Sequence, residues 1–209
     1  LDEHFEAVKQ VAVADRLLLT KTDLAPADSV TALRERLATL NPAADIVTVT
    51  HGELDSAAIQ NLGLWNAETR SLEVARWLKP QRYQPASAGK LGGKPRAALH
   101  DARIQAFSVV LDAPLDRYGL QSALSMLASF RAENLLRFKA IVNLQGEPQP
   151  TVLHGVQHVL YPEVKLDAWP DDDRRSRFVF IVRDLDPDFV AKLLADFSGA
   201  AQNPAAVSP

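Results

Sequence analysis

The first 49 residues contain two kinds of hydrophobic pattern, which alternate along the chain. Residues 3–14 place apolar side chains every three or four positions, the spacing of one face of an amphipathic helix. Arg16–Thr20 is a short apolar run of the kind that forms a buried strand in a parallel sheet. Residues 29–40 repeat the helical spacing up to Asn41-Pro42, and Asp45–Val49 is again strand-like. This alternation predicts βα units and a parallel sheet.

A change of composition separates this part from the rest of the chain. The pattern of residues 54–78 is helical in parts and includes Trp65 and Trp77. Lys79–Ala98 then has three prolines, three glycines, five basic residues and no acidic residue. Such a composition is typical of a flexible linker. We therefore expect one domain over residues 1–78, a linker over 79–98 and a second domain after it.

The second domain has a different order of elements. In chain order the pattern predicts a strand, a helix, three strands and a helix, at Arg103–Leu111, Asp116–Phe130, Leu136–Leu144, Thr151–Leu160, Arg177–Arg183 and Pro187–Phe197. This order suits a ferredoxin-like α+β sandwich over residues 99–198, with helices on one face of an antiparallel sheet. We expect a disordered tail over residues 199–209. The predicted fold class is α+β overall, with an α/β segment first.

Composition narrows the classes of function. The net charge of −3 argues against broad nucleic-acid binding, which usually needs a strong basic excess. The chain has no cysteine, so it can form neither a disulfide nor a thiolate metal site. No apolar run approaches the length that spans a membrane, and no signal peptide is recognisable. We expect a cytoplasmic protein with no nucleic-acid or membrane partner.

The most informative motif is LLLTKTDL at residues 17–24, in which a strand leads into Thr-Lys-x-Asp. GTPases of the P-loop class read guanine with [N/T/S]-K-x-D at the end of a strand. The carboxylate of Asp23 can accept hydrogen bonds from N1–H and the 2-amino group of guanine, which adenine does not offer. Lys21 can lay its methylene stem along the base, and Thr20 can brace the loop. The same spacing also occurs in solvated loops, where Lys21 and Asp23 would have no ligand.

Longer segments of the sequence point to one family. HFEAVKQVAVADRLLLTKTDL and LATLNPAADIV resemble the second half of the GTPase domain of CobW-type metallochaperones. RFKAIVNLQGEPQPTVLHGVQHVLYP and LDAWPDDDRRSRFVFIVRDLD resemble the C-terminal domain of the same family. The resemblance covers most of the chain outside the linker and the tail. It implies that residues 1–78 are the C-terminal part of a P-loop GTPase domain and that residues 99–198 are a CobW C-terminal domain.

Proteins of this family are P-loop GTPases that deliver zinc or cobalt, and some act in cobalamin synthesis. The resemblance therefore implies GTP or GDP and Mg²⁺ for the full-length parent, with zinc or cobalt as cargo. Its guanine motif falls on Thr20, Lys21 and Asp23, with the loop after Asp45–Val49 as a weaker base contact. The phosphate loop G-x-x-x-x-G-K-[ST] and the C-x-C-C metal motif are absent from the chain. We expect no catalytic residue, no metal ligand and no tightly bound cofactor in this chain alone.

Histidines and basic residues of the second domain have two interpretations each. His154 and His158, on one predicted strand, would lie roughly 13 Å apart, too far to chelate one metal ion together. Either could join a ligand on another strand, or both could be ordinary strand histidines. Arg137 and Lys139 project from the face opposite the apolar stripe of their strand. They could form a docking surface for a partner or for the GTPase segment, or an ordinary solvated face.

Two hypotheses of different classes follow. In the first, the parent is a GTP-dependent metal chaperone, and the C-terminal domain is a regulatory module that docks a client metalloenzyme. In the second, the chain is a stand-alone, non-catalytic interaction domain derived from that family. Residues 1–66 would expose a sheet edge and an apolar face, and we expect this part to be marginally stable alone unless a missing N-terminal half, dimerisation or disorder resolves the exposure.

Overall fold

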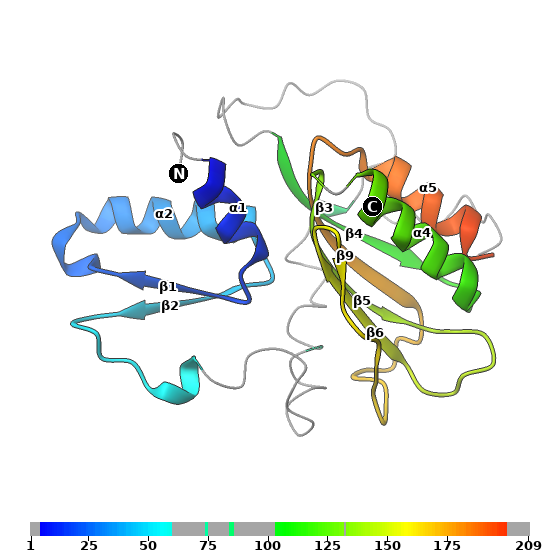
Figure 1. Cartoon of the computed structure of the whole chain (residues 1–209). Helices are drawn as coiled ribbons and strands as arrows, with labels where there is room; N and C mark the ends of the chain where they lie inside the picture. The colour runs from blue at the N-terminus through cyan, green and yellow to red at the C-terminus, as the bar shows by residue number, and fades with distance from the viewer. Residues whose placement is uncertain (1–4, 60–73, 75–83, 86–102, 132, 200–209) are drawn as a thin grey trace.

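The computed structural model describes residues 5–59, 74, 84–85, 103–131 and 133–199 (Figure 1). We call residues 5–59 the N-terminal unit and residues 103–199 the C-terminal unit. Trp65, Trp77, His100, the tail after residue 199 and most of the predicted linker lie outside the described residues. None of the helices in the described part of the chain combines the length and the apolar composition that a membrane span requires.

The N-terminal unit contains the predicted helix–strand–helix–strand order. Its elements are α1 (Phe5–Val13), β1 (Arg16–Thr20), η1 (Thr22–Leu24), α2 (Ala27–Leu40), β2 (Asp45–Val49) and η2 (Ser56–Ala58). The strands β1 and β2 pair in parallel, with Arg16 opposite Asp45 and Thr20 opposite Val49. The predicted βα unit and parallel pairing are therefore confirmed.

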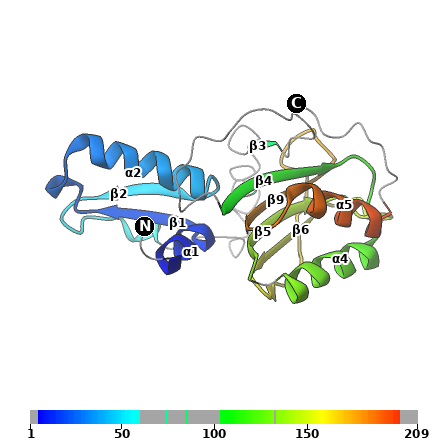
Figure 2. The same cartoon turned by 90° about the horizontal axis from the view of Figure 1, so that it is seen from above.

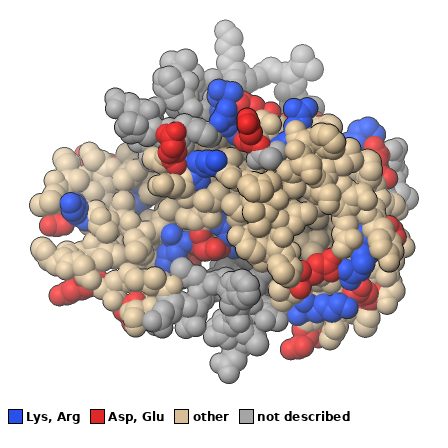
Figure 3. Space-filling model, viewed as in Figure 1, with Lys and Arg blue, Asp and Glu red and all other residues tan. Residues whose placement is uncertain are grey.

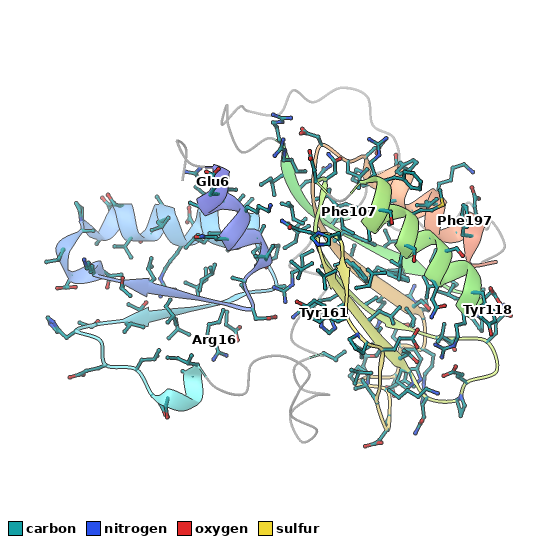
Figure 4. All side chains as sticks on the ribbon, viewed as in Figure 1. Glu6, Arg16, Phe107, Tyr118, Tyr161 and Phe197 are labelled. Atoms are coloured by element: carbon teal, nitrogen blue, oxygen red, sulfur yellow. The ribbon has the colours of Figure 1, made fainter. Side chains whose placement is uncertain are left out.

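The two faces of the β1–β2 sheet have different surroundings. Leu17 and Leu19 pack against a cluster on α1 and α2 that includes Val8 and Leu37. The alternate side chains of β1 point to the other face, where Arg16 lies in Figure 4 and where 44% of Leu18 is exposed. The expectation of a buried strand is thus wrong for one face of β1, because both helices cover the same side.

The C-terminal unit is a two-layer α+β sandwich, which confirms the predicted fold class. Its elements are β4 (Ile104–Leu111), α4 (Arg117–Phe130), β5 (Leu135–Val142), β6 (Thr151–Val156), β7 (Val159–Leu160), β8 (Val164–Lys165), β9 (Ser176–Arg183) and α5 (Pro187–Phe197). The strand order is β3 (Gln84–Pro85), β4, β9, β5, β6, β7, with β8 beside β6, and the long strands are antiparallel to one another. Helices α4 and α5 cover one face (Figures 1 and 2). Inside the predicted linker, Gln84–Pro85 form β3 and pair with β4.

The core between the sheet and its helices is built on stacked aromatic rings. Phe180, at the centre of β9, stacks on Phe107 at 5.4 Å and on Phe138 at 5.9 Å between ring centroids. Leucines of α4 and α5 close the core above these rings. The other face of β5 is also buried, because α1 and Val74 pack against it. The central strand β5 therefore has both faces covered, which a single alternating pattern does not predict.

A local irregularity in β5 changes the face of the sheet on which one of its side chains lies. The pairing of β5 with β9 shifts between Leu135 and Arg137, which is a β-bulge. As a result Leu135 lies in the helix-side core, while Leu136 packs with Ala12 of α1. Strict alternation along the strand predicted at Leu136–Leu144 would place Leu136 on the same face as Phe138, and the bulge places it on the other face.

The strand predicted at Thr151–Leu160 is in fact two strands. Gln157 adopts a left-handed conformation with φ 55°, and the chain turns back so that Gly155 pairs with Leu160. Consequently His154 lies in β6 and His158 in the turn, so the prediction that both histidines lie on one strand is wrong.

Helices α4 and α5 pack closely because of a glycine. Tyr118, at the start of α4, and Phe197, at the end of α5, lie at the same end of the layer (Figure 4). A Cβ atom at Gly119 would lie 1.8 Å from the carbonyl oxygen of Phe197. Asp116 caps the same end of α4 by accepting a hydrogen bond from the Gly119 amide at 2.7 Å.

We expect Gly119→Ala to lower the free energy of unfolding by about 1–3 kcal/mol, because backbone atoms must move apart. The better helix propensity of alanine offsets part of this loss. Urea denaturation of the chain measures the change. Ser122→Ala, on the exposed side of the same helix, is the matched control and should stay near the wild-type value. Equal stability of Gly119→Ala and wild type would contradict the close packing.

Candidate functional site

The residues of the Thr-Lys-x-Asp motif lie together in a tight turn at the carboxyl end of β1. Thr20 is the last residue of β1, and Lys21 adopts a left-handed conformation with φ 57° and ψ 30°. Thr22–Leu24 then form η1, and the Leu24 amide donates to the Lys21 carbonyl at 3.1 Å. A left-handed conformation costs a non-glycine residue roughly 1–2 kcal/mol. The side chains of Lys21 and Asp23 are both exposed, and neither forms a hydrogen bond or ion pair with another of the residues that the structure describes.

The weaker candidate, the loop after β2, lies beside this turn. Because Thr20 pairs with Val49 in a parallel ladder, the segments that follow β1 and β2 leave the sheet at the same edge. His51 and Gly52 have φ of 51° and 78°, and Thr50 bridges to Glu53 to close a second tight turn. Ligands of open parallel sheets bind beyond the carboxyl ends of the strands. The structure thus brings the two predicted base-contact loops together, at the end of the sheet farthest from the C-terminal unit (Figure 1).

Arginine side chains hold the elements that carry these loops. Arg34 of α2 donates to the hydroxyl of Thr48 in β2. Arg16, at the start of β1, donates to Asp45 of β2 at 3.3 Å and to the carbonyl of Ala58 in η2. These contacts fix the register of β1 on β2, and with it the relative height of the two loops.

The opposite end of the N-terminal unit is a corner, formed by residues 11–15, where α1 leads into β1. Asn41, fully buried at the end of α2, fastens it: its side-chain amide donates to the carbonyls of Val11, Ala12 and Ala14 at 2.8–3.2 Å. The carbonyl oxygen of the same side chain accepts from the amide of Ala44. Asn41 therefore joins the end of α2 to the end of α1. The sequence predicted only that Asn41-Pro42 stops a helix.

The C-terminal unit contacts this corner through two cations of β5. Arg137, with 5% of its surface exposed, donates to the carbonyl of Val13 and to the carboxylate of Asp15. Lys139 donates to the same oxygen of Asp15 at 2.7 Å. Acidic and basic side chains meet between the two units in Figure 3. The structure thus favours the interpretation of Arg137 and Lys139 as a docking surface for the N-terminal unit.

The ionisation of Asp15 and His154 reflects this contact. Burial would raise the pKa of Asp15, but the positive charges of Lys139 and Arg137 outweigh it and lower the pKa to about 2. His154 lies opposite Lys139 on β6 and stacks on Tyr161 with ring centroids 4.4 Å apart. Burial, reinforced by Lys139 and Arg137, lowers the pKa of His154 to about 4. Both side chains are therefore fixed in one charge state at neutral pH.

The described residues fit only part of a guanine nucleotide and no metal site. The exposed carboxylate of Asp23 can accept hydrogen bonds from N1–H and the 2-amino group of guanine, and the methylene stem of Lys21 can lie along the base. No G-x-x-x-x-G-K-[ST] string for phosphates occurs in the 209 residues. Among the described residues, no group of three or more His, Asp or Glu side chains could hold a metal ion. The contacts of Asp15 and Asn41 were missed by the sequence analysis, because they join residues far apart in the chain.

His154 should remain neutral in the folded protein until the pH approaches 4. The unfolded chain takes up a proton near pH 6.5, so the stability contributed by neutral His154 is present above pH 6.5 and is lost as the pH falls towards 4. NMR titration of the His154 ring measures this directly. Lys139→Met should raise the pKa of His154, whereas Lys192→Met on α5 should leave it unchanged. An identical titration in both variants would contradict the described packing.

Two family descriptions match separate parts of the sequence. Residues 2–48 match the nucleotide-binding domain of CobW/HypB/UreG, and residues 104–198 match the C-terminal domain of the cobalamin synthesis protein CobW. The zinc chaperone YjiA of Escherichia coli (strain K12) is 33% identical over 175 residues, which cover 84% of this chain and 49% of that protein. The chain therefore spans about half the length of this curated relative.

Solved structures of the same relative have a similar fold. The Zn(II)-bound YjiA GTPase from E. coli matches with a TM-score of 0.64 and 28% identity, over 93% of this chain and 55% of that one. A Zn(II)-bound triple mutant of YjiA GTPase matches with a TM-score of 0.63 and 29% identity, over 94% of this chain and 56% of that one. Both parts of the chain and the arrangement of their elements lead to one conclusion: the chain belongs to the CobW family of P-loop GTPases.

Proposed function

We propose that this chain supplies the guanine-reading loop and the C-terminal module of a GTP-dependent metal chaperone. The observation that carries the proposal is the pair of adjacent tight turns at the carboxyl ends of β1 and β2. One of them presents Thr20, Lys21 and Asp23 in the order that reads guanine in P-loop GTPases. The resemblance to a zinc chaperone supports the choice of this function over other uses of GTP.

Recognition of the base follows from the chemistry of the exposed loop. The carboxylate of Asp23 would accept hydrogen bonds from N1–H and the 2-amino group of guanine. Adenine has no hydrogen at N1, so it cannot form the same pair of bonds. The left-handed conformation of Lys21 sets the direction in which its methylene stem leaves the sheet edge. Thr20 holds the start of the turn, and the loop that contains His51 would close the other side of the base.

The remaining parts of the activity require groups that this chain does not contain. GTP hydrolysis needs backbone amides, a lysine and Mg²⁺ around the β- and γ-phosphates. The 209 residues contain no phosphate-loop string and no cysteine. A thiolate site for zinc or cobalt would therefore not be built from these residues either. In this proposal the chain alone binds no nucleotide tightly and hydrolyses no GTP.

The C-terminal unit would act as a regulatory and client-docking module in this proposal. Its sheet contacts the corner of the N-terminal unit through Arg137 and Lys139, so a movement of one unit would displace the other. A zinc or cobalt enzyme is the proposed client. A link to cobalamin synthesis is supported only by the description of the matching C-terminal domain. A stand-alone interaction domain without nucleotide is the alternative.

Calorimetric titration of GDP and GTP tests the proposal. The longest natural form of the protein, expressed from its own start codon, should bind both nucleotides, and the present chain should bind neither tightly. Absence of binding by either form would favour the stand-alone interaction domain. Tight binding by the present chain would contradict the account of the phosphate contacts.

Asp23→Asn should lower the affinity of the longest natural form for GDP by about 10–100-fold, since a charge-assisted pair of hydrogen bonds is lost. The same variant should gain affinity for xanthosine diphosphate, because an amide can donate to the 2-carbonyl oxygen of xanthine. Asp28→Asn, an exposed position in the first turn of α2, is the matched control with the same change of charge. Equal losses for both nucleotides would argue against Asp23 as the base-reading residue.

A further inference from the structure

Two elements of the N-terminal unit run from the corner to the guanine-reading loop. β1 begins one residue after Asp15 and ends at Thr20. α2 begins at Ala27, just beyond the loop, and ends next to Asn41, which is bound to the corner. The loop therefore joins the end of β1 to the start of α2. The start of β1 and the end of α2 are held together at the corner by Asn41. A strand and a helix are stiff over this length, so the position of the corner sets the position of the loop.

The C-terminal unit holds the corner by a charged contact and an apolar one. Arg137 bonds to the carbonyl of Val13 on one side of the turn and to Asp15 on the other. Next to them, Ala12 is fully buried against Leu136 and Ile181 of the C-terminal sheet. Lys139 adds a second cation on the carboxylate of Asp15. One acidic side chain thus receives two cations from a strand that lies more than 120 residues further along the chain.

The contact depends on the negative charge of Asp15. Arg137 is buried, and desolvation of a guanidinium is costly unless a carboxylate lies against it. The Nε atom of Arg137 and the Nδ1 atom of His154 are buried and have no hydrogen-bond partner among the described residues. The region therefore contains positive charge that Asp15 balances, together with two nitrogens that Asp15 does not satisfy. Removal of this charge would therefore weaken the attachment of the corner to the C-terminal sheet.

We propose that Asp15 is a positioning residue, through which the C-terminal sheet sets the place of the guanine-reading loop. The inference rests on the proposed binding of guanine nucleotide and names a residue that acts on it from the opposite end of β1. Coupling of this kind is reciprocal: a base in the loop strengthens the contact of the two units, and the contact strengthens base binding. The C-terminal unit would thereby sense whether the base-reading site is filled.

The test compares affinities for GDP and inosine diphosphate in the longest natural form of the protein. Inosine lacks the 2-amino group, so the ratio of the two affinities reports how well Asp23 is placed. Asp15→Asn should lower GDP affinity about tenfold and inosine diphosphate affinity much less, in the range that couplings between sites usually cover. Asp15→Glu keeps the charge and should restore most of the ratio. A purely structural role would lower both affinities by the same factor.

A matched control separates this effect from loss of any ion pair. Asp171 accepts two hydrogen bonds from Arg177 on the same sheet, away from the corner. Asp171→Asn therefore makes the same chemical change and should leave the affinity ratio unchanged. A folded Asp15→Asn protein with the wild-type ratio would overturn the inference.

Hydrogen exchange gives a second readout that needs no nucleotide. In the present chain, amides of residues 18–24 should exchange faster in Asp15→Asn than in wild type or Asp171→Asn. If the longest natural form binds neither nucleotide, the proposed function fails, and this measurement alone decides the positioning role. Faster exchange would then support the link between corner and loop, and unchanged exchange would overturn it.

Discussion

The burial of Arg137 is the constraint on which the arrangement of the two units depends. A guanidinium with 5% of its surface exposed must be paired, because the loss of hydration costs several kcal/mol. Its partners, the carbonyl of Val13 and the carboxylate of Asp15, are supplied by the corner between α1 and β1. Once this contact forms, α1 covers the back of the C-terminal sheet. The central strands of that sheet then have apolar contacts on both faces.

This second layer of contact explains the composition of β5. Toward the helices it contributes Phe138, Ala140 and Val142 to the aromatic core. On the other face it contributes Ile141 to the cluster around Val74, and Leu136 to the contact with α1. Polar side chains on this face would be solvated if the C-terminal unit stood alone. In the structure Arg137 and Lys139 bind the N-terminal unit, so this face of the sheet supports the segment that carries the base-reading loop.

Local sequence patterns were sufficient for most of the elements. β1, β2 and α5 have the bounds that were expected, since apolar spacing and helix-stopping residues act over a few positions. The bulge that turns Leu136 over was not predictable, because it depends on pairing with β9 rather than on the local pattern. The turn at Gln157 was missed because no glycine marks it, although its conformation is left-handed.

In the candidate site too, the proximity of residues that are close in the sequence was predictable, and contacts between distant residues were not. Thr20, Lys21 and Asp23 are adjacent in the sequence, so their proximity could be expected from the motif alone. Their relation to the loop after β2 followed from the parallel pairing that the βα order predicts. The contact of Asp15 with β5 joins residues 122 and 124 positions apart, and a single sequence contains no signal for it. Arg137 and Lys139 were recognised as a candidate docking surface, but the residue they bind was not.

Because Lys21 has a left-handed backbone, the residue that would be most stable at this position differs from the residue that suits base recognition in the proposed role. Glycine would adopt φ 57° without the steric penalty and would relax the turn after β1. It would also remove the alkyl stem that lies over the base in the proposed role. Lysine at this position is then a case in which folding energy is sacrificed for ligand contact. Directed evolution for thermostability, without a nucleotide-dependent screen, would be expected to replace this residue early.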